Sequence, residues 1–234
     1  MITLEIGGRQ VQAYPGQTIL EAAKAAGIHI PTLCNLEGLN PWGACRLCLV
    51  EVKTWRGKLV PSCATAVEEG MEVVAHSQRL RELRRTILEL LFAERNHICA
   101  VCVSNGNCEL QDLACELGMD HVRFPYRFPA LGLDATHERY VVDHNRCVLC
   151  GRCVRACSEV EGAMTWGFSN RGVDTLVATD IGGPWIDSST CTECGKCVEA
   201  CPTGALLDKR TSAAEQEKEP EVISRVTERR PRAD

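Results

Sequence analysis

The chain has few aromatic residues and no long apolar run. Phenylalanine, tryptophan and tyrosine make up 5% of its 234 residues, so its cores are expected to be small and aliphatic. No stretch approaches the roughly 20 apolar residues of a membrane span. Residues 1–30 hold no basic start followed by an apolar run, so we expect no signal peptide. The net charge of −5, without a long basic stripe, does not suggest nucleic-acid binding.

Motifs for bond-making chemistry are also missing. No G-x-G-x-x-G follows a predicted strand, and no P-loop occurs, so neither a dinucleotide site nor a nucleoside triphosphate site is visible. No Ser-His-Asp or paired-carboxylate arrangement can be argued from the sequence. We therefore expect a chain without catalytic residues of its own.

Cysteine, in contrast, is abundant. The chain has sixteen cysteines, and fifteen fall into four spaced groups. Disulfides would explain them in a secreted protein, but without an export signal metal ligation in a reducing compartment is the better interpretation. This predicts a cytoplasmic location and clusters that hold small cores together.

The most specific signal is a repeated C-x2-C-x2-C-x3-C run, typical of bacterial two-cluster ferredoxins. Three cysteines of each run hold one 4Fe–4S cluster and the fourth reaches across to the other cluster. The runs are separated by 33 residues, and Ser158 stands where the first run would often have proline. The predicted ligand sets are Cys147, Cys150, Cys153 and Cys201 for one cluster, and Cys157, Cys191, Cys194 and Cys197 for the other.

A further group lies near the N-terminus, where four cysteines can hold a 2Fe–2S or a 4Fe–4S cluster. Its spacing is not the plant-type C-x4-C-x2-C. A grasp-type frame is predicted around it and favours 2Fe–2S. A structural zinc site usually has two C-x2-C pairs, and only one is present here. The ligands are expected to be Cys34, Cys45, Cys48 and Cys63.

The remaining group, C-x2-C-x5-C, is one ligand short of a 4Fe–4S set. His97 and Cys115 are the two candidates for the fourth position. An imidazole is neutral where a thiolate is negative, so a histidine ligand raises the reduction potential. We favour His97 and expect Cys115 to be a small buried residue within a helix. The set is then His97, Cys99, Cys102 and Cys108.

The pattern predicts an α+β chain of several parts. The N-terminal β-grasp 2Fe–2S ferredoxin-like domain starts with a hairpin at 2–6 and 9–14, then a helix opened by a Thr18-x-x-Glu21 capping box. Helical spacing of leucines marks 77–95, and strands are expected at 46–53, 58–62, 71–74 and 173–179. The sequence predicts five segments. Residues 1–76 form the 2Fe–2S domain, 77–118 a helical His/Cys3 segment for a 4Fe–4S cluster, and 119–140 a connecting segment. Residues 141–207 form the two-cluster 4Fe–4S ferredoxin-like domain, and 208–234 a flexible tail.

Five stretches carry a resemblance to a known family. They are PTLCNLEG (31–38), ACRLCLVEV (44–52), NHICAVCVSNGNCELQDLA (96–114), DHNRCVLCGRCVRAC (143–157) and CTECGKCVEACPTGA (191–205). Together they resemble the small iron–sulfur diaphorase subunit of bidirectional NAD(P)-reducing nickel–iron hydrogenases. They are also similar to the N-terminal module of the large iron–sulfur subunit of respiratory NADH dehydrogenase and of iron-only hydrogenases. The respiratory module has three residues between its histidine and first cysteine, whereas here only Ile98 intervenes, as in the hydrogenase subunit.

The resemblance implies an electron-transfer subunit of an oxidoreductase. One 2Fe–2S and three 4Fe–4S clusters would relay single electrons between a flavin mononucleotide and NAD(P)-binding diaphorase subunit and the small and large nickel–iron hydrogenase subunits. The alternative is the equivalent subunit of another NAD-linked enzyme, such as formate dehydrogenase or NADH dehydrogenase. A diffusing ferredoxin, a zinc scaffold and a regulatory iron–sulfur sensor are the other hypotheses, and the sensor has no helix-turn-helix to support it.

Overall fold

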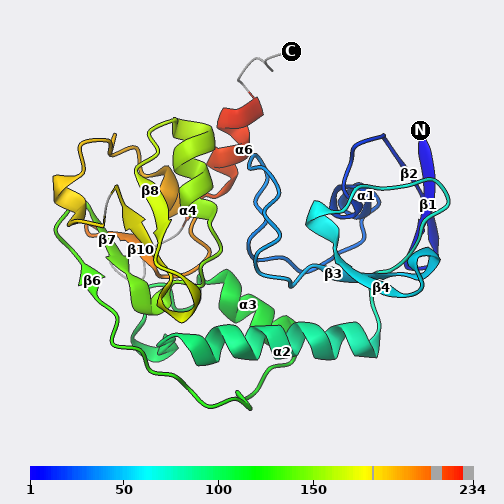
Figure 1. The fold of residues 1–234 in the computed structure, drawn as a ribbon, viewed down its shortest axis with the longest axis horizontal. Coiled ribbons are helices and arrows are strands. Elements are labelled where there is room, and N and C mark those ends of the chain that lie inside the picture. The colour runs from blue at the N-terminus through cyan, green and yellow to red at the C-terminus, as the bar shows by residue number, and fades with distance from the viewer. Residues whose placement is uncertain (181, 212–217, 229–234) are drawn as a thin grey trace. The chain divides into compact units, whose positions relative to one another are not determined.

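The computed structural model describes residues 1–180, 182–211 and 218–228. The chain forms two compact units. The first comprises Met1–Asn35, Pro41–Leu90 and Leu113–His121, and the second comprises Leu36–Asn40, Leu91–Asp112 and Val122–Asp234. The mixed α+β class is as predicted (Figure 1). The first four segments predicted from the sequence stay a prediction, and positions 212–217 and 229–234 of the fifth lie outside the described residues.

A five-stranded mixed sheet is the centre of the first unit. The strand order is β2-β1-β5-β3-β4, with β1 parallel to β5 and every other pair antiparallel. The predicted hairpin, helix and later strands all occur, with slightly shorter bounds. The elements are β1 (Ile2–Ile6), β2 (Arg9–Ala13), α1 (Ile19–Ala25), β3 (Leu49–Val52), β4 (Lys58–Pro61) and β5 (Glu72–Val74).

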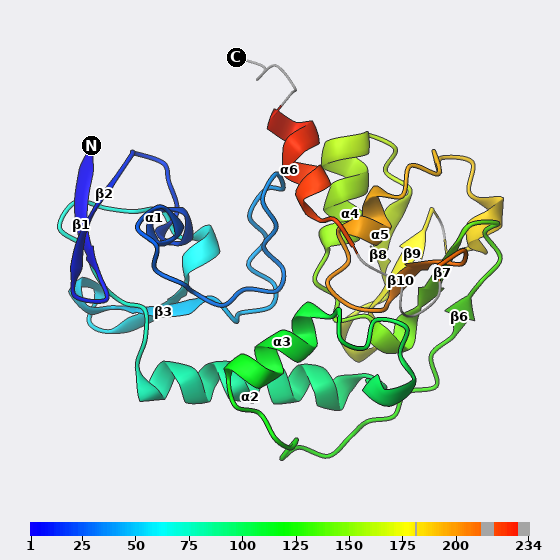
Figure 2. The same cartoon turned by 180° about the vertical axis from the view of Figure 1, so that it is seen from behind.

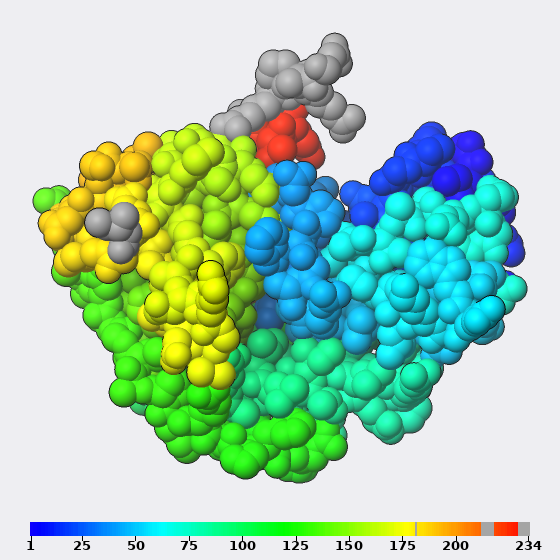
Figure 3. All heavy atoms as spheres, in the orientation of Figure 1, coloured from blue at the N-terminus to red at the C-terminus, as the bar shows by residue number. Residues whose placement is uncertain are grey.

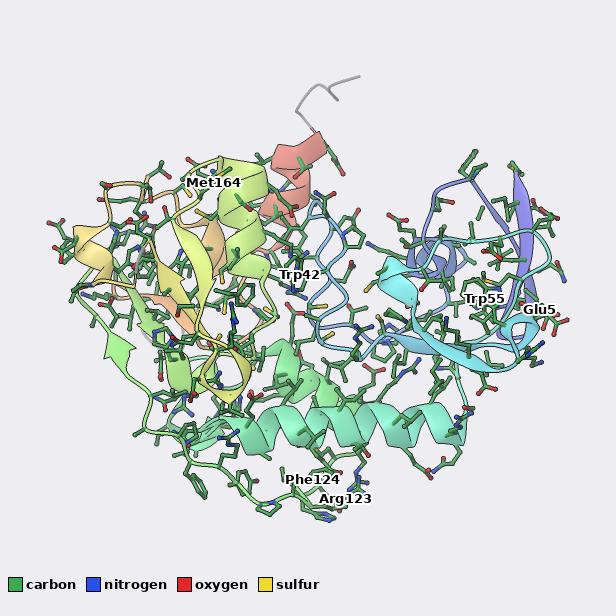
Figure 4. All side chains as sticks on the ribbon, in the orientation of Figure 1. Glu5, Trp42, Trp55, Arg123, Phe124 and Met164 are labelled. Atoms are coloured by element: carbon green, nitrogen blue, oxygen red, sulfur yellow. The ribbon has the colours of Figure 1, made fainter. Side chains whose placement is uncertain are left out.

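Alternation and capping explain why these segments form. Leu4 and Ile6 point into the core of this unit, while their neighbours are less buried, as expected for a strand with one face covered. At the start of α1, the Thr18 hydroxyl accepts from the Glu21 N–H, and the Glu21 carboxylate accepts from the Thr18 N–H at 2.7 Å. The predicted capping box is therefore present. Figure 4 shows Trp55 within this unit, packed against the same core.

Two longer helices follow in the chain, α2 (Gln78–Glu94) and α3 (Glu109–Glu116). In α3 the buried positions Leu110 and Leu113 are three residues apart, and Leu117 just beyond the helix is also buried. Cys115 lies off that face and is exposed. Our prediction that Cys115 is a small buried residue is therefore wrong, because the helical period turns its side chain away from the leucine face.

The second unit contains two small antiparallel sheets, ordered β10-β7-β6 and β8-β9 (Figure 2). The predicted strand at 173–179 begins later, because Gly172–Asp174 form a 3-10 turn. Two short helices start directly after glycines. The elements are β6 (Leu133–Asp134), β7 (Tyr140–Asp143), α4 (Arg152–Arg155), β8 (Trp166–Ser169), β9 (Leu176–Thr179), α5 (Lys196–Glu199) and β10 (Leu206–Asp208).

Shorter helical turns complete both units. The chain continues from α4 into a π-helical turn, and Ser158 within it donates from its hydroxyl to the Val154 carbonyl at 3.0 Å. Proline at that position could not donate a backbone N–H to such a turn, which accounts for the serine. The turns are Lys53–Trp55, Ser62–Ala64, Cys99–Val101, His144–Arg146, Ala156–Glu161 (π), Gly172–Asp174 and Trp185–Asp187.

Part of the predicted tail forms secondary structure. Asp208 belongs to β10, and α6 (Glu221–Glu228) is a helix whose Ile223 side chain is 0% exposed. Ile223 packs in a cluster with Leu39 and Val160. The prediction of a flexible tail over 208–234 is wrong for these residues, since one apolar face of α6 is buried in the second unit. No helix among the described residues is both long and apolar enough to cross a membrane.

Candidate iron–sulfur sites

The N-terminal cysteines are all buried in the first unit. Cys34 follows α1, Cys45 and Cys48 precede β3, and Cys63 lies in the turn after β4. None is more than 8% exposed. The sulfurs of Cys48 and Cys63 are 3.3 Å apart, and the Cys34 N–H donates to the Cys45 sulfur at 3.4 Å. The structure therefore brings all four predicted ligands together in a single group.

The electrostatics of this group favour a bound cation. The Cys45 and Cys63 thiols donate to the Cys34 sulfur and thereby lower the pKa of Cys34. The same bonds raise the pKa of Cys45 and of Cys63, and burial raises both further. The hydrogen bond with Cys63 lowers the pKa of Cys48 to about 7, so Cys34 and Cys48 lose their protons more readily than an isolated thiol, while Cys45 and Cys63 lose theirs less readily. Iron ions would supply the compensating positive charge.

In the second unit, one cavity is lined by His97, Cys99, Cys102 and Cys108. The His97 Nε2 is buried and has no hydrogen-bond partner among the described residues. Burial, followed by the nearby positive charges of Arg146 and Arg95, lowers the pKa of His97 to about 4. The imidazole is thus neutral, which is the form that binds metals. The exposed Cys115 does not line this cavity.

Gly204, three residues after the last cysteine of the ferredoxin-like run, also lines this cavity. A Cβ at this position would lie 2.7 Å from the Cys102 sulfur and 3.1 Å from the Ser104 hydroxyl oxygen. No side chain fits there without moving the sulfur. No sequence motif marked this role, because Gly204 is 96 residues from Cys108 in the chain and only the fold brings them near.

A second cavity is lined by Cys147, Cys150, Cys153 and Cys201, the set predicted for one ferredoxin-type cluster. Burial raises the pKa of Cys147 to about 11 and of Cys150 to about 12. The pKa of Cys153 is raised well above its ordinary value by burial and then by the charges of its neighbours. The rest of the wall is mainly apolar: Val142, Val148, Gly151, Trp166, Val177, Pro202, Thr203, Ala205 and Leu206.

A third cavity is lined by Cys157, Cys191, Cys194 and Cys197. Cys157 of the first run therefore lies with three cysteines of the second run, and Cys201 of the second run lies with three cysteines of the first. This is the arrangement that the cross-over pattern predicts. Burial raises the pKa of Cys197, and the neighbouring cysteine charges raise it further. Cys194 is exposed, so this set reaches the surface of the unit.

The two runs share one backbone conformation. Leu149 and Glu193 have φ angles of 52° and 58°, and Gly151 and Gly195 have φ angles of 71° and 75°. These left-handed residues bend each loop around its cysteines before α4 or α5 begins. A Cβ on Gly195 would lie 2.8 Å from the Tyr140 hydroxyl oxygen, so glycine is required there for space as well.

An ion pair ties the second and third cysteine groups together. Both Glu109 carboxylate oxygens accept from Arg152, at 2.5 and 2.7 Å, and Arg152 is 2% exposed. Glu109 follows Cys108, and Arg152 precedes Cys153. This bidentate pair fixes the two loops relative to each other within the second unit.

Within the described ranges, no three histidine, cysteine or acidic side chains converge on a single metal-ion position. Sequence reasoning also missed the groups that hydrogen-bond the ligand sulfurs. The Thr165 N–H donates to the Cys157 sulfur at 3.3 Å, and the Trp185 indole N–H donates to the Cys191 sulfur at 3.4 Å. Both donors lie in the 33 residues that separate the two runs, where no motif marked them.

Four family models match parts of this chain. Residues 1–78 match the 2Fe-2S iron-sulfur cluster binding domain, and residues 84–123 match the NADH-ubiquinone oxidoreductase-G iron-sulfur binding region. Residues 146–205 and 183–228 each match a 4Fe-4S dicluster domain. The chain thus carries one 2Fe–2S-binding domain followed by 4Fe–4S-binding regions.

Two relatives are subunits of different oxidoreductases that use NAD or NADH. The chain is 34% identical over 180 residues to the gamma subunit of the NAD-reducing hydrogenase HoxS of Cupriavidus necator, covering 76% of each chain. It is 38% identical over 181 residues to a G-type subunit of the NADH-quinone oxidoreductase of Rhizobium meliloti, covering 76% of this chain and 21% of that longer relative.

A solved structure shows the same fold. A chain of an NAD+-reducing [NiFe]-hydrogenase in the H2-reduced state superposes with a TM-score of 0.85 at 39% identity, covering 90% of this chain and 88% of that one. The chain therefore belongs to the family of iron–sulfur gamma subunits of NAD-reducing hydrogenases, which is related to the G-type subunits of NADH-quinone oxidoreductases.

Proposed function

We propose that this chain relays single electrons between a flavin and NAD(P) site on one partner and a nickel–iron centre on another. The observation that carries the proposal is the grouping of all sixteen predicted ligands into four sets, three of which line cavities of the second unit. No residue arrangement for substrate chemistry was found in the sequence. In this proposal the chain is an electron-transfer subunit of an oxidoreductase, and its partners carry the substrate chemistry.

The side chains present fit four clusters. Cys34, Cys45, Cys48 and Cys63 would hold the 2Fe–2S cluster, and the three cavities would each hold a 4Fe–4S cluster. The His97 Nε2 is buried and has no hydrogen-bond partner among the described residues, which supports His97 as the fourth ligand beside three cysteines. Each cluster, when bound, can accept and release one electron at a potential that its surroundings set. The protein's part is to hold the sulfurs in place and to exclude water from them.

The partners are proposed from the names of the relatives, an NAD-reducing hydrogenase subunit and a chain of an NAD+-reducing [NiFe]-hydrogenase. These favour a diaphorase subunit with flavin mononucleotide and NAD(P), together with the small and large subunits of a nickel–iron hydrogenase. The short spacing between His97 and Cys99 favours the same family over the respiratory module. A cytoplasmic location is part of the proposal and rests on the many cysteines that are expected to be kept reduced.

A second candidate is the corresponding subunit of another NAD-linked oxidoreductase. The rhizobial relative, at 38% identity, favours an NADH dehydrogenase. Formate dehydrogenase is the other alternative, and it is a prediction from the sequence. The cluster set would be the same in each case. The substrate that reduces NAD+ through the native complex separates these candidates.

Iron and acid-labile sulfide analysis tests the cluster content directly. Full-length chain purified without oxygen is expected to contain about 14 iron atoms and about 14 sulfides. Mössbauer and electron paramagnetic resonance (EPR) spectra should show one 2Fe–2S and three 4Fe–4S clusters. Zinc in place of iron, or iron for fewer clusters in the native complex, would contradict the proposal.

A further inference from the structure

The 33 residues between Cys157 and Cys191 are longer than a simple connection between two cluster loops requires. Their described residues form β8, β9 and the turns Gly172–Asp174 and Trp185–Asp187. In Figure 3 parts of this segment are visible at the surface of the second unit in yellow and gold. Three buried residues of this insertion, Thr165, Trp166 and Trp185, line the cavity of Cys157, Cys191, Cys194 and Cys197. The insertion therefore builds one wall of that cavity.

This wall presents hydrogen-bond donors to the sulfurs. The Trp185 indole N–H donates to the Cys191 sulfur at 3.4 Å, and the Thr165 N–H donates to the Cys157 sulfur at 3.3 Å. The Trp166 side chain lines the same cavity. Two of the four sulfurs in this set, those of Cys157 and Cys191, thus receive a donor from the insertion.

The Trp185 ring is held firmly in place. Its side chain is 1% exposed, and its backbone N–H donates to the Asp134 carboxylate at 2.7 Å. The ring stacks on Tyr140 at 5.6 Å between centroids and meets the edge of Trp166 at 4.7 Å. A donor locked in this way needs no reorganisation when charge on the sulfur changes.

We propose that Trp185, through its indole hydrogen bond to Cys191, raises the reduction potential of the cluster that this set holds. The inference rests on the proposed function, because it requires a cluster at this site. Reduction adds one negative charge to the cluster, and a hydrogen bond strengthens as its acceptor becomes more negative. The N–H therefore stabilises the reduced form more than the oxidised form, and the potential rises.

The test is a redox titration of the full chain monitored by EPR. Trp185→Phe keeps an apolar ring but removes the N–H, so it isolates the hydrogen bond from water exclusion. At a fixed potential, the ratio of oxidised to reduced cluster is expected to increase about tenfold in Trp185→Phe, the usual difference between a neutral and a charge-assisted hydrogen bond. A titration unchanged from wild type, or shifted to a higher potential, would overturn the proposal.

Two controls separate the hydrogen bond from packing. Tyr140→Phe disturbs the same aromatic group by removing the hydroxyl that donates to the Glu193 carbonyl at 3.0 Å, but Tyr140 donates to no sulfur. Trp55→Phe makes a similar substitution in the first unit (Figure 4). Neither should shift this cluster. An equal shift in Tyr140→Phe would show that packing, not the N–H, sets the potential.

A spectroscopic measurement covers the case in which Trp185→Phe does not assemble. Trp166→Phe protein labelled with ¹⁵N in the tryptophan indoles should show ¹⁵N coupling to this reduced cluster in pulsed EPR. The substitution removes the other indole that lines the cavity, so the coupling would come from Trp185, which donates to Cys191. Absence of that coupling would overturn the proposal. Cys194→Ser identifies the signal: if it changes no 4Fe–4S signal at all, the proposed function has failed at this site rather than the role of Trp185.

Discussion

The α-carbon of Gly204 faces the sulfur of Cys102 so closely that a Cβ on it would lie 2.7 Å from that sulfur. Gly204 follows the last cysteine of the ferredoxin-like run, whereas Cys102 belongs to the His/Cys3 group. The two cluster regions of the second unit are therefore built around each other. A substitution at Gly204 should therefore displace a ligand of the His/Cys3 group.

Gly204→Ala should selectively remove the cluster of the His97 set. The added methyl group displaces the Cys102 sulfur, so we expect the loss of about four irons per chain while the other clusters stay. Iron analysis and EPR measure this. Gly132→Ala is the matched control, because a Cβ there meets nothing within 4 Å. If Gly204→Ala left the iron content unchanged, the loop would accommodate the added methyl group without moving Cys102, and the prediction would be wrong.

His97→Ala should also remove that cluster, because the cavity then offers three ligands instead of four. Cys115→Ser should leave it intact, since Cys115 is exposed and does not line the cavity. Iron content and the EPR spectrum of each variant decide between them. The reverse outcome, with the cluster lost in Cys115→Ser and kept in His97→Ala, would assign the fourth ligand to Cys115.

The exchange of fourth ligands between the two ferredoxin-type sites predicts pairs of matching spectra. Cys201→Ser should lose the same EPR signal as Cys150→Ser, since both line one cavity. Cys157→Ser should match Cys194→Ser for the same reason. If Cys201→Ser instead matched Cys194→Ser, each run would hold its own cluster and the assignment would be wrong.

Ile223→Ala should destabilise the second unit by about 2–5 kcal/mol, the usual cost of truncating a fully buried isoleucine. Ile223 is 0% exposed and packs against Ala156 and Ala200, next to two cluster ligands. Thermal unfolding of the anaerobic, cluster-loaded chain measures the change. Glu228→Ala, at an exposed position of the same helix, should unfold at the same temperature as the wild-type chain. Equal stability of all three chains would mean that α6 does not contribute.

Spacing predicted most of the groups of ligands, because cysteines that hold iron–sulfur clusters recur at characteristic intervals in the chain. It predicted the N-terminal sheet for a similar reason, since Leu4 and Ile6 alternate with less buried residues in a local pattern. Burial of α6 and the donors Thr165 and Trp185 could not be predicted. The burial of α6 depends on contacts between residues far apart in the chain, such as Ile223 with Leu39. Thr165 and Trp185 lie eight and six residues from the sulfurs they bond, but the bonds depend on how the insertion folds, and no motif marks them.

Hydrogen-dependent reduction of NAD+ by the native complex, purified without oxygen through this chain, tests the central claim most directly. We predict activity that is accompanied by copurifying nickel and flavin, together with iron for all four clusters. An intact, iron-loaded complex that reduces NAD+ with formate but not with hydrogen would contradict the claim and assign the chain to a different NAD-linked oxidoreductase.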